Sequence, residues 1–150
     1  MPPGGGDARW VTGSLDTVKL TAARTGGALG LIESTERKGD APPFHVHTNE
    51  DEAYYVIEGE LTFFIGEQTF KVAAGSVVFA PRGITHTYRV DSERSRLVAI
   101  NVPGGWEAFF TEAGTPASGT SEPPEDPPDF DALSTLAEAR GVSIVGDPPR

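Results

Sequence analysis

The strongest constraint on the fold is a series of short apolar segments between residues 39 and 102, separated by Gly, Pro and polar turns. Strands with turn signals at such close intervals are typical of an antiparallel sandwich or barrel. The 18 glycines and 13 prolines of the 150-residue chain exceed average usage and supply those turns. The sequence therefore predicts one all-β domain, long enough to bury a single hydrophobic core.

The expected strands either alternate apolar and polar residues or form short apolar runs. They span residues 16–22, 28–35, 44–48, 53–57, 61–65, 68–72, 77–80, 85–90 and 97–102. After them the sequence predicts a short helix over 104–114 and a helix over 129–140 that Gly141 ends. Residues 142–145 are compatible with one more short strand.

Composition divides the chain into three parts. Residues 1–9 are rich in Pro and Gly and are expected to form a flexible tail. Residues 10–114 are expected to hold the barrel and the short helix after it. Residues 115–150 are expected to form a Pro-rich arm and a C-terminal helix that packs on the barrel.

The balance of charge argues against two classes of partner. The formal net charge is −10 and the sequence pI about 4.6, so neither nucleic acid nor an anionic membrane surface is expected to bind. There are no cysteines, which excludes disulfides and thiolate metal sites. No apolar run approaches the length of a spanning helix, and the N-terminus lacks the features of a signal peptide. We expect a cytoplasmic protein.

All three histidines of the chain fall into two clusters. His45 and His47 lie two residues apart, so on a strand they point to the same side. The polar turn after them lets Glu52 face that side too, and His86 comes from a later strand. Four N and O ligands without sulfur suit a divalent transition metal, namely Fe, Mn, Ni, Co, Cu or Zn. The alternative, surface histidines beside an acidic turn, leaves the Pro-Gly loop before His86 unexplained.

Two motifs around these residues resemble those of the cupins. Gly39-x5-His45-x-His47-x4-Glu52-x6-Gly59 is similar to the first cupin motif, and Gly75-x5-Pro81-x-Gly83-x2-His86 is similar to the second. The resemblance implies a double-stranded β-helix (jelly-roll) barrel of six to eight strands with the metal inside. It also implies that His45, His47, Glu52 and His86 are the ligands. One position departs from the pattern, because Val90 stands where the second motif often has Asn, which leaves the polarity of the pocket open.

Strand parity extends the site to a predicted substrate pocket. Residues two apart on a strand share a face, so side chains beyond Glu52 and His86 should line the same cavity. On the next strand either Phe63 with Ile65, or alternatively Phe64, should face it. Ordinary packing explains any single one of these residues, and it is the favoured explanation for the aromatic stripe over 106–110. The candidates are Tyr54, Val56, Phe63, Tyr88, Val90 and Phe109.

The segment 103–110 and the Pro-rich stretch after it resemble monocupins similar to quercetin 2,3-dioxygenase. That resemblance implies an oxidoreductase, a metal-dependent dioxygenase acting on a small aromatic or enol substrate. Glu52 would then be both a ligand and the general base that takes the enol proton. A non-redox isomerase, cyclase or lyase that uses the metal as a Lewis acid is the alternative. A cupin that binds a small molecule without catalysis is a third possibility.

A homodimer is also expected. Cupins commonly pair their barrels by exchanging edge strands, and an open sheet edge is a liability that pairing removes. The first strands and the acidic C-terminal region are the segments expected to take part.

Overall fold

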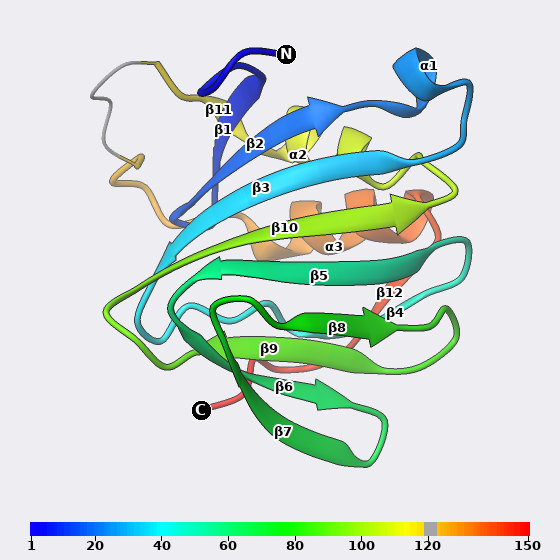
Figure 1. Ribbon diagram of the computed structural model, residues 1–150. Coiled ribbons are helices and arrows are strands. Elements are labelled where there is room, and N and C mark those ends of the chain that lie inside the picture. Colours follow the sequence, from blue (N-terminus) through cyan, green and yellow to red (C-terminus); the bar gives the residue numbers. More distant parts are fainter. Residues whose placement is uncertain (119–122) are drawn as a thin grey trace.

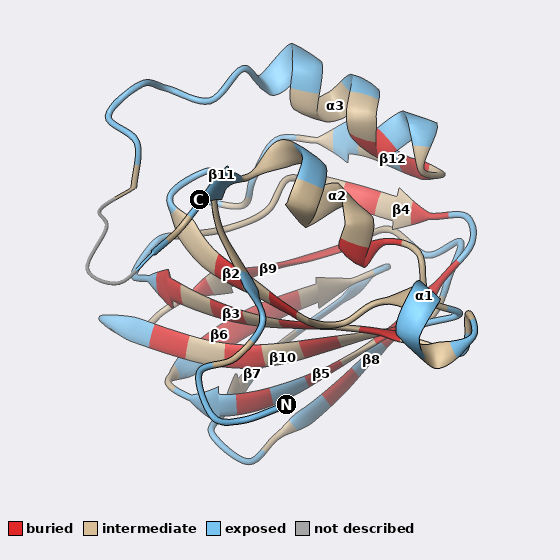
Figure 2. Cartoon of the chain, turned by 90° about the horizontal axis from the view of Figure 1, so that it is seen from above, coloured by how far each residue is buried: buried red, intermediate tan, exposed pale blue. Residues whose placement is uncertain are grey.

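The computed structural model describes residues 1–118 and 123–150. Antiparallel strands form two sheets that pack face to face, and their buried residues lie on the surfaces that meet (Figures 1 and 2). The seven-stranded sheet has the order β11-β1-β2-β3-β10-β5-β8: β11 (Thr115–Pro116), β1 (Asp7–Val11), β2 (Ser14–Leu20), β3 (Gly30–Arg37), β10 (Arg94–Val102), β5 (Asp51–Glu58) and β8 (Val77–Ala80).

The five-stranded sheet carries the histidines. Its order is β12-β4-β9-β6-β7: β12 (Val142–Gly146), β4 (Phe44–His47), β9 (His86–Val90), β6 (Glu60–Ile65) and β7 (Gln68–Ala73). This architecture confirms the all-β jelly-roll fold expected from the sequence. None of the helices in the described ranges is long and apolar enough to span a membrane.

The core lies between the two sheets and follows strand alternation. On β3, for instance, buried and half-buried residues alternate from Gly30 to Glu36. Leu61, Phe63 and Leu97 are fully buried in the main apolar cluster, and Ile65 packs against that cluster. Phe64 contacts Phe44 instead, so Phe63 and Ile65 are the inward pair on β6.

Within residues 1–118 and 123–150, three helices follow or interrupt the strands. Helix α1 (Ala22–Thr25) ends at Gly26, whose φ of 64° places it in the left-handed region. Helix α2 (Glu107–Ala113) follows the barrel, and helix α3 (Phe130–Ala139) begins at Asp129, whose side chain accepts from the backbone N–H of Ala132. The two later helices lie on the same side of the molecule, and the chain continues from α3 into β12 (Figure 1).

Two expectations about the N-terminal region were wrong. Residues 7–9 do not belong to a flexible tail, because β1 begins at Asp7 and pairs with β2. The hairpin between them turns at Thr12 and Gly13, with φ values of 50° and 100°, as a tight turn with two left-handed residues requires. Ala22 starts helix α1 rather than ending a strand, because the chain leaves the sheet at Leu20.

The structure describes residues 115–118 and 123–150 of the C-terminal part. Of the expected Pro-rich arm, residues 119–122 lie outside the described residues. Before them, β11 pairs with β1 at Thr115 and Pro116. After them, the expected helix and the expected short strand both form, and β12 pairs with β4. The C-terminal strand therefore covers the edge of the strand that carries His45 and His47.

Candidate metal centre

The structure brings His45, His47, Glu52 and His86 together. One potential ligand atom from each residue lies within 4.8 Å of the others, and all four side chains are buried. The local reason is strand geometry: His45 and His47 alternate with Val46 on β4, and His86 lies directly opposite His45 on β9. Glu52 reaches the same point from β5, on the other sheet.

The carboxylate of Glu52 is the centre of the cluster. Its Oε2 atom lies 2.8 Å from Nε2 of His86, 3.1 Å from Nε2 of His47 and 3.9 Å from Nε2 of His45. The same oxygen accepts a hydrogen bond of 2.8 Å from the Tyr54 hydroxyl. The three imidazoles therefore present the same ring nitrogen to one carboxylate oxygen.

The other ring nitrogens are held by groups around the cluster. Nδ1 of His45 lies 2.8 Å from the carbonyl of Pro43, and Nδ1 of His86 lies 2.9 Å from the carbonyl of Ile84. Nδ1 of His47 lies 3.2 Å from the carboxylate of Glu50. Because a carbonyl or carboxylate can only accept, each Nδ1 carries a proton, and a neutral ring then presents the lone pair of Nε2 to the centre of the cluster. This is the arrangement that metal-binding histidines adopt.

Among the ring nitrogens of the cluster, one is buried without a hydrogen-bond partner in the part of the chain that the structure describes. Nε2 of His47 has none, although its ring is fully buried. A buried polar atom without a partner costs about 1–3 kcal/mol, and native structures rarely keep one without a reason. Coordination of a cation by Nε2 would remove that cost, so the donor set and its orphaned atom fit a metal ion.

The electrostatics of the cluster favour a positive charge at its centre. Burial alone would raise the pKa of Glu52, but hydrogen bonds and charge interactions with the histidines hold that pKa well below its usual range. Burial lowers the pKa of His45. For His86 burial acts in the same direction, yet contact with the Glu52 carboxylate raises its pKa overall. Glu52 is thus a carboxylate that attracts cationic partners.

Two residues near the site, Glu50 and Asn101, were not predicted from the sequence, and a third, Trp106, was expected mainly to pack in the core. Glu50, which lies in the polar turn after β4, contacts His47. Asn101 on β10 donates from Nδ2 to Oε1 of Glu52 at 2.6 Å. Trp106, just before α2, packs edge-on against His47 with ring centroids 5.0 Å apart. Asn101 and Trp106 lie far along the chain from the residues they contact, so no local motif marks those two contacts, whereas Glu50 lies three residues after His47.

The residues expected to line a substrate pocket divide into two groups. Five are buried and belong to the main apolar cluster, where the Tyr54, Phe63 and Tyr88 rings contact one another. They are Tyr54, Val56, Phe63, Tyr88 and Val90. Phe109 lies elsewhere, stacked on Trp106 in a second cluster with α3 and β12. Core packing thus accounts for Phe109, and Trp106 connects it to the site.

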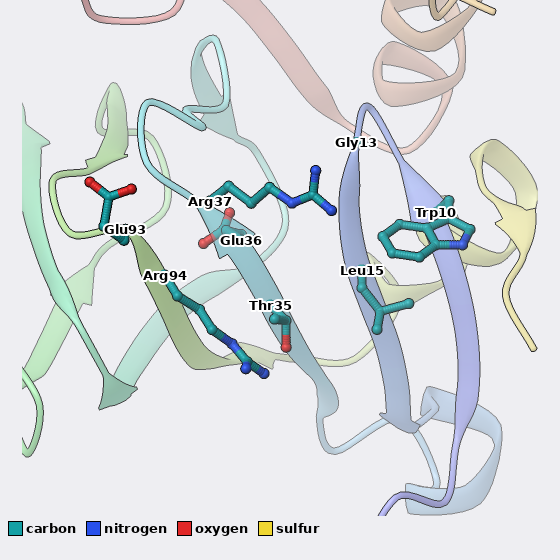
Figure 3. Close-up of a pocket in the computed structure, with 8 residues that line it drawn as sticks. All are labelled: Trp10, Gly13, Leu15, Thr35, Glu36, Arg37, Glu93 and Arg94. Atoms are coloured by element: carbon teal, nitrogen blue, oxygen red, sulfur yellow. The ribbon is translucent and has the colours of Figure 1, made fainter. Parts of the chain in front are cut away.

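A surface pocket lies away from the histidines. Residues of β1, β2, β3 and β10 and of the turns beside them line it, among them Trp10, Leu15, Thr35 and Arg94 (Figure 3). None of the four candidate ligands lines it. The surface pocket is therefore separate from the candidate metal centre.

Comparison with known proteins decides the family. Residues 33–103 match the cupin domain. This chain is a cupin. The matched region contains all four residues of the cluster and both motifs. It runs from β3 to the residue after β10, so it covers the strands that surround the site.

Two curated relatives carry the same name. The chain is 30% identical over 146 residues to a quercetin 2,3-dioxygenase of Bacillus subtilis, covering 97% of this chain and 43% of that protein. It is 28% identical over 123 residues to a quercetin 2,3-dioxygenase of Aspergillus japonicus, covering 77% of this chain and 35% of that protein. The chain thus spans less than half the length of both relatives.

A solved structure supports the fold independently. The crystal structure of a predicted oxalate decarboxylase from Thermotoga maritima superposes with a TM-score of 0.62 at 18% identity. The match covers 68% of this chain and 96% of that one. The barrel is therefore shared well beyond the range of close sequence similarity.

Proposed function

We propose that this cupin is a metal-dependent dioxygenase of the quercetinase-like type, acting on a small aromatic or enol substrate. The observation that carries the proposal is the convergence of three Nε2 atoms and one carboxylate oxygen, with every Nδ1 held by an acceptor. The shared name of the two curated relatives supports the reaction class.

In this proposal His45, His47, Glu52 and His86 are the ligands of one divalent transition metal. Such an ion would supply an electrophilic centre that draws electron density from an enol or phenol oxygen. Glu52 has the second role of accepting the proton of the substrate hydroxyl. Its carboxylate is buried, and Tyr54 and Asn101 hold its orientation through hydrogen bonds. A positioned carboxylate of this kind contributes typically 10²–10⁴-fold to a proton-transfer step.

The proposal is tested by metal analysis of protein purified without a histidine tag, combined with oxygen uptake on a panel of small flavonols. We expect oxygen consumption in step with loss of the flavonol. Turnover of a substrate under nitrogen by zinc-loaded protein would instead support a non-redox isomerase, cyclase or lyase. Tight binding of a small molecule without any product would support a binding protein.

Glu52→Gln tests the role of the carboxylate in the reaction. The amide keeps the shape of the side chain but cannot accept the substrate proton. We expect turnover to fall by at least about 10²-fold while the three imidazoles retain part of the bound metal. Metal content is measured on the same samples, so loss of metal and loss of the base are distinguished. Unchanged turnover in this variant would overturn the role of Glu52 as the base.

We also propose that the chain forms a homodimer, through a different surface from the one the sequence suggested. The edge of β1 is covered by β11, and the edge of β4 is covered by β12. Strand β8 ends the seven-stranded sheet, and the outer face around it is apolar. The exposed side chains there are Tyr55, Ile57, Val77, Phe79 and Val102.

A second copy of the chain is the occupant we propose for this apolar face. In the pairing of β5 with β8, Tyr55 lies opposite Val77, and Phe79 lies opposite Ala53, two residues before Tyr55. Strand β10 pairs with the other edge of β5, so the exposed side chains form one patch across β10, β5 and β8. Contiguous exposed apolar patches of this kind mark interaction sites.

A further inference from the structure

Asn101 is the nearest buried polar neighbour of Glu52 outside the proposed ligand set. It lies directly opposite Glu52 in the pairing of β10 with β5, and its side chain is fully buried. Nδ2 donates to Oε1 of Glu52 at 2.6 Å, which is short for a hydrogen bond from an amide nitrogen. The acceptor is an ionised carboxylate, so this is a charge-assisted bond.

The two oxygens of Glu52 therefore have different surroundings. Oε2 faces the Nε2 atoms of the imidazoles, at 2.8 Å from His86 and 3.1 Å from His47. Oε1 is occupied by Asn101. Each oxygen accepts a hydrogen bond, Oε2 from Tyr54 and Oε1 from Asn101, but only Oε2 also lies beside the imidazole nitrogens, where a cation held by them would be.

The orientation of the Asn101 amide costs free energy, because it leaves the amide oxygen unsatisfied. Because the carboxylate can only accept, Nδ2 must face it, and Oδ1 is left buried without a hydrogen-bond partner among the described residues. Leucine at this position would fill a similar volume and leave no orphaned oxygen. Such an unsatisfied buried atom calls for a functional reason, and the amide nitrogen provides one.

We infer that Asn101 is a positioning residue that turns Oε1 of Glu52 away from the metal, so that Glu52 binds through Oε2 alone. The inference rests on the proposed metal site and adds to it the mode of carboxylate binding.

Titration of metal-free protein with Co²⁺, followed by visible absorption, tests the role of Asn101. Asn101→Leu removes the donor, which frees Oε1 to approach the ion. We expect Co²⁺ to bind 10–100-fold more weakly, the usual effect of losing a group that orients a ligand. We also expect a changed visible spectrum, because a second carboxylate oxygen raises the coordination number. Asn101→Ala is the second variant, in case leucine disturbs folding.

Ser34→Ala is the matched control. Ser34 is buried in β3 and its hydroxyl donates to Asp16 at 2.5 Å, so the variant also removes a buried hydrogen bond, but not one at the cluster. We expect its Co²⁺ affinity and spectrum to equal those of the wild type. Circular dichroism and thermal melts show which variants are folded.

A measurement on the wild type alone completes the test. In the infrared difference between Co²⁺-loaded and metal-free protein, the separation of the two carboxylate stretches distinguishes binding through one oxygen from binding through two. We expect the wide separation of one-oxygen binding. A narrow separation, or folded Asn101 variants with wild-type affinity and spectrum, would overturn the inference about Asn101. A wild type that binds no Co²⁺ would instead overturn the metal site itself.

Discussion

Asp16 and Glu36 are carboxyl groups buried inside the barrel, away from the four candidate ligands. The hydrogen bonds that reach them come from hydroxyl groups: Ser14 and Ser34 donate to Asp16, and Tyr88 and Ser95 donate to Glu36. Burial raises the pKa of Asp16 to about 6. Burial, with the nearby charges of Asp16 and Asp40, raises the pKa of Glu36 to about 8.

Glu36→Gln tests this pKa. The raised pKa means that the folded wild type holds a proton on Glu36 that the unfolded chain releases above its ordinary value of 4.5. The wild type should therefore lose stability as the pH rises from about 4.5 to about 8, at about 1.4 kcal/mol for each unit of pKa difference. We expect the free energy of unfolding of Glu36→Gln, relative to wild type, to increase over that range by a few kcal/mol. Urea denaturation at a series of pH values measures it.

Glu33→Gln, on the same strand, should show the opposite pH dependence. Burial of Glu33 is outweighed by Arg96 and Lys19, which lower its pKa. Glu33 therefore stabilises the folded state above its unfolded pKa and loses that effect as the pH falls. A stability difference for Glu36→Gln that does not change with pH would contradict the raised pKa of Glu36.

At the scale of elements, Glu107 joins α2 to the start of α1 and to the barrel. Its carboxylate accepts from the backbone N–H of Ala22 at 2.6 Å and from that of Gly105 at 2.7 Å. Gly30 on β3 makes room for it, because a Cβ there would lie 2.1 Å from Oε2 of Glu107. Trp106, next to Glu107, is thereby fixed against His47.

Gly30→Ala should disturb this junction. The carboxylate is held at both oxygens, so it cannot move away without breaking a hydrogen bond, and we expect a loss of about 1–3 kcal/mol in the free energy of unfolding. In a Glu107→Ala background the same substitution should cost much less, because the clashing atoms are gone. Chemical denaturation of the four proteins of this cycle measures the coupling. Equal costs in both backgrounds would contradict the steric account.

Elements with a local signal could be predicted from the sequence. Most strands of the barrel, α3 and β12 follow from periodicity, Gly and Pro, and the four candidate ligands follow from strand parity around the two motifs. Strand β1 could not be predicted, since Asp7-Ala8-Arg9 follows Gly and Pro residues and forms a strand only by pairing with β2. Asn101 was missed for the same reason, because its contact with Glu52 depends on how distant strands are brought together. Glu50 is different, since it contacts His47 only three residues away, and the turn between them gave no pattern that marks the contact.

At the scale of the whole molecule, the exposed apolar face around β8 leads to a prediction about assembly. Phe79 is 58% exposed and Val77 is 71% exposed, on the strand that ends the seven-stranded sheet. If a second copy covers this face, a charge there would be buried without a partner and would cost several kcal/mol of association energy. We expect wild type to sediment as a dimer and Phe79→Glu as a folded monomer.

Analytical ultracentrifugation over a range of concentrations measures this equilibrium. Phe130→Glu is the control, because Phe130 is also exposed, at 64%, but lies at the start of α3. It should leave the dimer unchanged. A wild type that stays monomeric at high concentration would contradict the assembly.

In the proposed metal centre, His45, His47, Glu52 and His86 hold one divalent metal ion. Elemental analysis of untagged wild type and of His47→Ala, each incubated with excess metal and then desalted, tests it most directly. His47 is the most informative ligand to remove, since its Nε2 atom is buried and has no hydrogen-bond partner. The account predicts about one transition metal ion per chain in wild type and a large loss in the variant. A wild type without bound metal, or a variant that retains the full amount, would contradict it.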